Sequence, residues 1–129
     1  DQQHAGFLHP LEAWALVQAG EALLVDVRSA EELKADGQIP HSQHVAWQLG
    51  PLLLKNVRFV RELEKKTSKN AAVILICRSG IRSVAAAEAA IKAGFSQVFY
   101  VQEGIEGNAT NQQITVGGWR YWDLPVVHG

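Results

Sequence analysis

Residues 72–83 decide the fold, and they read Ala72-Val-Ile-Leu-Ile-Cys77-Arg-Ser-Gly-Ile-Arg-Ser83. The first five residues form an apolar run with the length of a buried strand. An alanine-rich segment, residues 84–93, follows the polar residues and has the composition of a helix that Gly94 ends. A strand, a short loop and a helix in this order make one unit of a parallel α/β sheet.

The same alternation of apolar and amphipathic blocks runs through the rest of the chain. The helices that we expect lie at residues 11–19, 30–36 and 56–66, and Ser29 and Glu32 stand at capping-box spacing before the second. The other strands lie at 23–27, 44–47 and 97–101, followed by a long polar loop at 102–118 and a short helix at 119–123. We predict a single α/β domain over residues 1–129, with a core of about 8–127. Its sheet is central and mostly parallel, with four or five strands and helices on both faces.

Composition and charge exclude several classes of function. The 129 residues are 47% apolar and carry twelve basic and thirteen acidic side chains, a net charge of −1. Nucleic-acid surfaces are basic, and a bilayer span needs about 20 apolar residues, so we expect neither kind of partner. Cys77 is the only cysteine, which excludes a disulfide scaffold or a Cys-rich zinc module. His41 and His44 have no third ligand at metal-site spacing, and no metal is assigned.

The start of the sequence and its single thiol indicate the cellular compartment. The sequence contains no methionine, which indicates a processed product or a piece of something longer, and no signal peptide is visible at its start. A lone thiol suits a reducing compartment. We therefore expect the cytoplasm, or the periplasm if an upstream signal has been removed.

Cys77 follows a strand directly, at the edge where parallel α/β folds place their ligands. Backbone N–H groups of the next residues can converge there, and the helix that follows adds partial positive charge at its amino end. Arg78 and Arg82 add two full positive charges. These features favour a thiolate nucleophile over the alternative that Cys77 is only a small buried apolar side chain.

The segment from Cys77 to Ser83 resembles the active-site loop of the single-domain rhodaneses, the thiosulfate and persulfide sulfurtransferases. Three other stretches resemble signatures of that family in the same order, namely Leu24 to Arg28 with Glu32 and 37–40, Ala93 to Val98, and Gly118-Trp119 with Leu124 to Val126. The chain departs from the family at Gln38, where His is usual, and at residues 41–43. Residues 102–118 also carry an insertion, which we expect near the mouth of the site, where it would set partner choice.

The resemblance implies a sulfurtransferase without a cofactor. Cys77 would take a sulfane sulfur from thiosulfate or a persulfide donor and pass it, as a Cys77 persulfide, to a thiol or cyanide acceptor. The donor and the persulfide would be bound by Arg78, Ser79, Gly80, Ile81, Arg82 and Ser83. The supporting residues would be Asp26, Arg28 and Glu32, as an ion-pair network rather than as acids or bases, together with Trp119 as the best candidate to line the pocket.

The sequence is compatible with alternative roles. Ser83 is also interpreted as a helix N-cap, which we prefer to a role as sulfur ligand. A phosphatase or arsenate reductase of the Cys-x5-Arg type is disfavoured, because only four residues separate Cys77 from Arg82. A non-catalytic rhodanese-like docking module, or a carrier in a sulfur relay with a partner protein, is the other alternative. The oligomeric state is left open.

Overall fold

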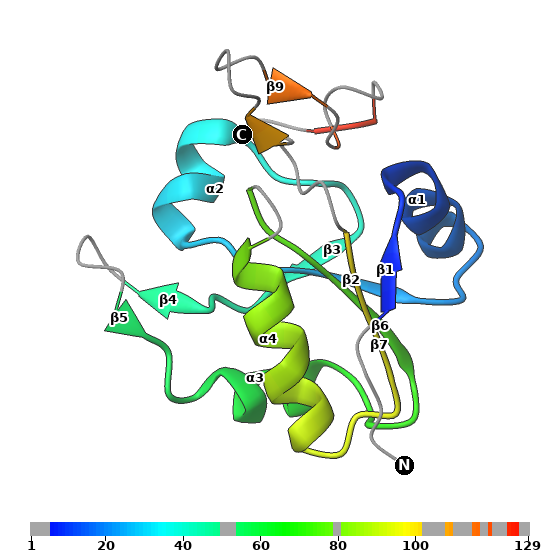
Figure 1. Cartoon of the computed structure of the whole chain (residues 1–129), viewed down its shortest axis with the longest axis vertical. Helices are drawn as coiled ribbons and strands as arrows, with labels where there is room; N and C mark the ends of the chain where they lie inside the picture. Colours follow the sequence, from blue (N-terminus) through cyan, green and yellow to red (C-terminus); the bar gives the residue numbers. More distant parts are fainter. Residues whose placement is uncertain are drawn as a thin grey trace.

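A five-stranded parallel sheet forms the centre of the molecule (Figure 1). The computed structural model describes residues 6–49, 54–78, 81–101, 108–109, 115–116, 119 and 124–126. In the order in which they lie side by side, the strands are β1 (Gly6–Leu8), β7 (Gln97–Val101), β6 (Ala72–Ile76), β2 (Leu23–Asp26) and β3 (Ser42–His44). All neighbouring pairs run parallel, so the predicted sheet of four or five mostly parallel strands is confirmed.

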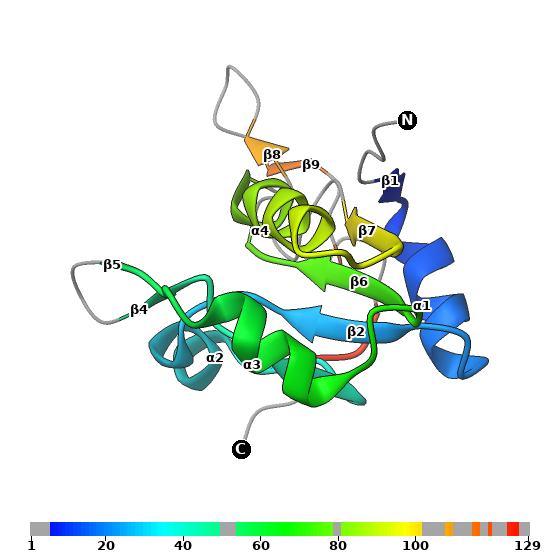
Figure 2. The ribbon, with the colours of Figure 1, turned by 90° about the horizontal axis from the view of Figure 1, so that it is seen from below.

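Helices cover both faces of this sheet, as a parallel sheet requires. In the described part of the chain they are α1 (Pro10–Gln18), α2 (Ala30–Asp36), α3 (Phe59–Lys66) and α4 (Ile81–Lys92). Helix α1 packs on one face of the sheet, and α3 and α4 pack on the other. In Figure 1, α1 lies to the right of β6 and β7, and α3 and α4 lie to their left, whereas Figure 2 shows the same elements from below. No helix within the described ranges combines the length and the apolar character that crossing a bilayer needs.

Strand β6 lies in the middle of the sheet, and its side chains alternate between two cores. Val73 and Leu75 pack in the cluster that α3 and α4 cover. Ile74 and Ile76 pack in the cluster that α1 covers. All four side chains are fully buried. A strand buried on both faces is a continuous apolar run in the sequence, which explains why the predicted bounds of this strand are correct.

Some boundaries differ from the predictions for local reasons. Strand β1 was not predicted, because three residues are too few to show an alternation. Strand β3 begins and ends earlier than the predicted strand at 44–47. Helix α3 begins three residues later than predicted. The side-chain oxygen of Asn56 accepts a hydrogen bond from the Arg58 N–H at 3.0 Å, and this local turn competes with helix.

Two short antiparallel ribbons complete the described elements. They are β4 (Gln48–Leu49) with β5 (Leu54–Lys55), and β8 (Asn108–Ala109) with β9 (Thr115–Val116). The second ribbon falls inside residues 102–118, so the prediction of a loop is wrong at these four positions. The predicted helix at 119–123 lies outside the described residues except for Trp119, which is in a turn.

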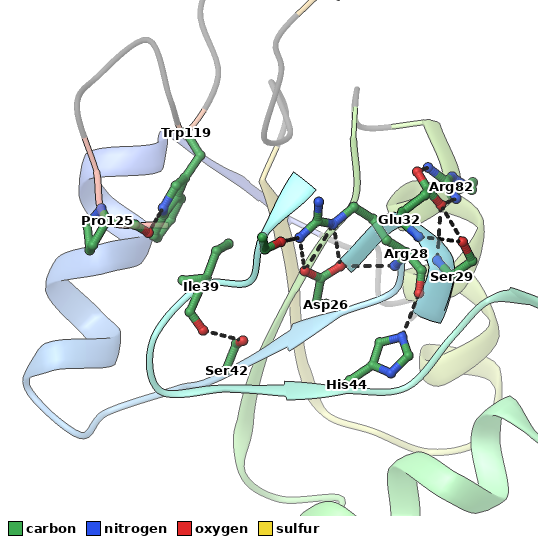
Figure 3. Close-up of polar contacts among 11 residues, drawn as sticks. Asp26, Arg28, Ser29, Glu32, Ile39, Ser42, His44, Arg82, Trp119 and Pro125 are labelled. Atoms are coloured by element: carbon green, nitrogen blue, oxygen red, sulfur yellow. Dashed lines mark hydrogen bonds and ion pairs between the residues drawn. The ribbon is translucent and has the colours of Figure 1, made fainter. Parts of the chain in front are cut away.

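A buried ion pair fixes the carboxyl end of β2. Asp26 and Arg28 are each 1% exposed. The guanidinium donates from Nε to both carboxylate oxygens at 3.1 Å and from Nη2 to Oδ2 at 2.8 Å. Nη2 also donates to the carbonyl oxygen of Gly37 at 2.8 Å (Figure 3). Gly37 ends α2 with a φ of 89°, a conformation that favours glycine, so the pair joins the end of β2 to the end of α2.

Replacement of Arg28 by alanine is predicted to be strongly destabilising. It leaves the Asp26 carboxylate buried without its counter-charge, which costs about 3–5 kcal/mol of unfolding free energy. Urea unfolding at pH 7 measures this loss. Lys34→Ala, at an exposed position of α2, is the matched control and should change the same quantity by less than about 0.5 kcal/mol. A loss of equal, small size in both variants would contradict the importance of the pair.

Candidate active site

The sulfur of Cys77 lies at the amino end of α4. Cys77 follows β6 directly and is 1% exposed. The backbone N–H of Ser83 donates a hydrogen bond to Sγ at 3.3 Å, and the Ser83 Oγ lies 3.5 Å from the same sulfur. A thiol donates its S–H to that hydroxyl, whereas a thiolate accepts the hydroxyl proton in a hydrogen bond of reversed direction. The Ser83 hydroxyl can therefore form a hydrogen bond with either form of the sulfur, and the Ser83 N–H donates to both.

Ser83 is not the N-cap of the helix, so that interpretation is wrong. Helix α4 begins at Ile81, which makes Ser83 the third helical residue. The N–H groups in a first turn have no partner within the helix, and in this helix Sγ accepts one of them. The helix begins two residues before the serine, and the Ser83 side chain is fully buried beside the sulfur.

Arg82 forms a two-pronged ion pair with Glu32 on α2. Its Nη1 lies 2.5 Å from Oε1 and its Nη2 lies 2.7 Å from Oε2 (Figure 3). The same Oε1 accepts hydrogen bonds from the backbone N–H and the hydroxyl of Ser29, which completes the predicted capping box of α2. Glu32 thus joins the start of α2 to the start of α4. Both terminal nitrogens of Arg82, which we expected to orient the donor, are directed to this carboxylate.

Charges near the sulfur reinforce one another. The hydrogen bonds from Arg82 lower the pKa of Glu32 from 4.5 to about 2, although burial alone would raise it. The Glu32 carboxylate in turn raises the pKa of Arg82, and Cys77 and Asp26 raise it further by their charge. Glu32 is thus the main partner of the Arg82 guanidinium, and the charge interaction with Cys77 is secondary to it.

The remaining predicted residues fall into three groups. Arg78 is exposed, and it forms no ion pair with a described carboxylate. Ser79 and Gly80 lie outside the described residues, and Ile81 is the first residue of α4. Trp119 is fully buried in the core that α1 covers, whereas Cys77 belongs to the core on the other face.

The packing of Trp119 differs from what we expected of a pocket-lining residue. Its ring meets that of Trp14 edge to face at 5.5 Å, and its Nε1 donates to the carbonyl oxygen of Pro125 at 2.9 Å. The side chain is 0% exposed. Trp119 supports the sheet by packing, and it presents no surface to a pocket among the described residues.

His44 is a contributor that the sequence did not indicate. Its Nε2 lies 2.7 Å from the carbonyl oxygen of Arg28, so it braces the backbone at the buried ion pair. We had considered His44 only as a metal ligand, together with His41. Nothing in the spacing of these residues signals a contact across sixteen positions of the chain. Among the residues that the structure describes, no three side chains of His, Cys, Asp or Glu gather as a metal site.

A comparison with models of protein families shows which family this chain belongs to. The model of the rhodanese-like domain matches residues 9–110. The chain belongs to the rhodanese-like family. A solved rhodanese-like neighbour, Rv0390 from Mycobacterium tuberculosis, is 33% identical and superposes with a TM-score of 0.85 over 98% of this chain and 100% of its own.

Other relatives of this rhodanese-like domain differ in their extent. An uncharacterized RP600 homolog from Rickettsia rickettsii is 32% identical over 116 residues, which cover 85% of this chain and 86% of that protein. Rhodanese-like domain-containing protein 11 of Arabidopsis thaliana chloroplasts is 35% identical over 71 residues, and the match spans only 24% of its length. The polysulfide-sulfur transferase of Wolinella succinogenes is 21% identical with a TM-score of 0.69 over 97% of this chain and 80% of its own, which shows a shared fold.

The ion pair between Glu32 and Arg82 predicts an acid-dependent loss of stability. Because the pKa of Glu32 is lower in the folded protein, the stabilisation is complete above pH 4.5 and is lost as the pH falls towards about 2. Glu32→Gln should be less stable than the parent by about 1–3 kcal/mol at pH 7, and this gap should close between pH 4.5 and 2. Urea unfolding across this pH range measures the gap.

Glu64→Gln provides the control for this measurement. Glu64 forms an ion pair with Lys69 at 3.2 Å, but both side chains are more than a third exposed. Pairs of this kind contribute little to stability, so no comparable gap is expected. A pH-independent gap for Glu32→Gln would show that its cost comes from lost packing rather than from the charge of the pair.

Proposed function

We propose that this rhodanese-like domain is a sulfurtransferase that works through a persulfide on Cys77. The observation that carries the proposal is the position of Sγ, which accepts the Ser83 N–H at the amino end of α4. An amide and a helix end directed at a sulfur favour its thiolate, which is the nucleophilic form. The partial positive charge at the helix end would also favour the negative charge on the outer sulfur of a persulfide.

The reaction would proceed in two displacements at sulfur. The Cys77 thiolate attacks the outer sulfur of thiosulfate, a new S–S bond forms, and sulfite leaves with the electron pair of the broken S–S bond. An acceptor thiolate or cyanide then attacks the outer sulfur of the persulfide, and the Cys77 thiolate leaves. Each step transfers a sulfur without a proton, so neither Asp26 nor Glu32 is needed as an acid or base. Their buried or paired geometry suits support instead.

The two arginines would have different roles. Arg78 is exposed, which leaves its guanidinium available to attract an anionic donor. Arg82 is held by Glu32 and would act as a positioning residue, which fixes the start of α4 and adds positive charge near the sulfur. This assignment changes our expectation that both arginines bind the donor.

Incubation with thiosulfate tests the reaction class. The intact mass of the protein should increase by one sulfur atom, and cyanide should restore the original mass with formation of thiocyanate. Cys77→Ser should abolish the mass increase and the turnover while the circular dichroism spectrum stays the same, since a hydroxyl is too weak an acid to replace a thiol. A docking module without catalysis would show no mass change in the parent protein. That result would overturn the proposal.

Two rates test the different roles of Arg78 and Arg82, namely the rate of turnover of thiosulfate and the rate of alkylation of Cys77. Arg78→Ala should lower kcat/KM for thiosulfate by about tenfold to a hundredfold, the scale of one lost charged contact. Its rate of alkylation by the neutral reagent iodoacetamide should change little. Arg82→Ala should slow both reactions, because it removes charge beside the sulfur itself, and Arg82→Lys should recover part of the loss. The opposite pattern, in which only Arg82→Ala affects thiosulfate selectively, would assign donor capture to Arg82.

A further inference from the structure

Exposed apolar and basic side chains gather on the β4–β5 ribbon and α3. We define the β4–α3 surface by Leu49, Leu54, Val57, Arg61, Lys65 and Lys66. The three apolar side chains are 48%, 64% and 89% exposed, and they are three of the five large apolar side chains that the described residues expose. Both views of the ribbon show β4 and β5 projecting away from the sheet (Figures 1 and 2). Exposed apolar groups concentrated in this way indicate an interaction site.

The basic side chains of this surface form no ion pair with a carboxylate in the part of the chain that the structure describes. Residues 54–66 carry five basic and two acidic side chains, in a chain whose net charge is −1. Glu64 pairs with Lys69, whereas Glu62 accepts a hydrogen bond from the neutral Asn56 amide at 2.8 Å and keeps its negative charge. No described carboxylate forms an ion pair with Lys65 or Lys66. With five basic and two acidic side chains, residues 54–66 have a formal charge of +3, so this part of the surface is locally positive.

A cavity of about 440 Å³ opens on this surface. Its lining residues are His44, Ala46, Leu49, Glu62, Lys65 and Lys66. The volume is within the range of sites that bind small ligands or inserted side chains. The two lysine ammonium groups of the lining outnumber the single carboxylate, Glu62, and they lie with the apolar Ala46 and Leu49. This lining is complementary to carboxylates that lie next to an apolar side chain. Because the feature is hollow, it fits a protein segment better than it fits the flat surface of a membrane.

The strand register places this cavity close to the nucleophile. His44 is the register partner of Asp26, and Asp26 is the register partner of Ile76, the residue before Cys77. Neighbouring strands lie about 4.8 Å apart, so the backbones of His44 and Ile76 are separated by about 10 Å. An extended chain covers that distance in about three residues. A thiol about three residues from the docked part of a segment is therefore within that distance of the strand end that carries Cys77.

We propose that the β4–α3 surface docks an acidic protein segment with an interleaved apolar side chain, and that this segment belongs to the thiol-bearing acceptor of the sulfur. The docking depends only on the charge and shape of the surface. The assignment of the docked segment to the sulfur acceptor rests on the proposed function. In the transfer, the acceptor thiolate attacks the outer sulfur of the Cys77 persulfide. A new S–S bond forms on the acceptor, and the Cys77 thiolate leaves with the electron pair of the bond that breaks.

Binding is tested first with a synthetic peptide, Glu-Leu-Glu-Glu-Leu-Glu-Gly-Gly-Ser, labelled with fluorescein and followed by fluorescence anisotropy. The double variant K65E/K66E should weaken binding by about fivefold or more at low salt, and added salt should weaken binding to the parent. Leu54→Ser should also weaken it. Lys92→Glu reverses an exposed charge at the end of α4 and should have no effect. Equal binding by the parent and K65E/K66E would overturn the docking proposal.

Transfer is then tested with the same peptide ending in Cys in place of Ser. The persulfide form of K65E/K66E should transfer sulfur to the peptide about fivefold more slowly than the parent, and should react with cyanide at the parental rate. An equal loss towards cyanide would overturn the acceptor role, because the lysines would then act on the persulfide itself. Failure of the parent to form a persulfide would refute the proposed function, and peptide binding would still decide the docking.

Lipid vesicles test whether the surface binds an anionic membrane instead of an acidic protein segment. Vesicles of phosphatidylglycerol and phosphatidylcholine in equal parts should not bring the protein down on sedimentation under conditions in which the peptide binds. Sedimentation with vesicles that K65E/K66E abolishes, together with no peptide binding, would overturn the proposal and identify the surface as membrane-binding.

Discussion

The buried ion pair between Asp26 and Arg28 is the constraint on which the rest of the site depends. It holds the carboxyl end of β2 and, through the Gly37 carbonyl, the end of α2. The segment between these two ends carries Glu32 in the first turn of α2, and Glu32 pairs with Arg82 at the start of α4. Helix α4 in turn holds Ser83 against the Cys77 sulfur. Removal of one partner of such a pair is costly because the other charge stays buried.

The two arginines near the nucleophile are alike in the sequence and different in the structure. Arg78 is exposed, and Arg82 is four-fifths buried with its positive charge balanced by Glu32. The pairing of Arg82 with Glu32 has a physical reason. An uncompensated guanidinium in a partly buried place would be costly, and the paired one still adds positive potential near the sulfur. The exposed arginine carries no such restriction, which suits a group that must bind and release an anion.

The parts of the molecule that were predictable are those with a local signal. Strand β6 was predicted with the correct bounds because both its faces are buried, and α2 because its capping box lies within four residues. The place of Cys77 between a strand and a helix was also predicted, from the apolar run before it and the alanine-rich segment after it. The pairing of Glu32 with Arg82 joins residues 50 positions apart, and no local pattern encodes it. The same holds for His44 against the Arg28 carbonyl and for the cavity between β4 and α3.

The hydrogen bond from the Ser83 amide to the Cys77 sulfur has a consequence for spectroscopy. An amide proton that points at sulfur is deshielded according to the charge on that sulfur, so its nuclear magnetic resonance frequency differs between thiol, thiolate and persulfide. The molecule thus contains its own reporter nucleus in the first turn of α4. In the proposed sulfur transfer, this one backbone resonance would follow the state of the Cys77 sulfur without a dye or an engineered label.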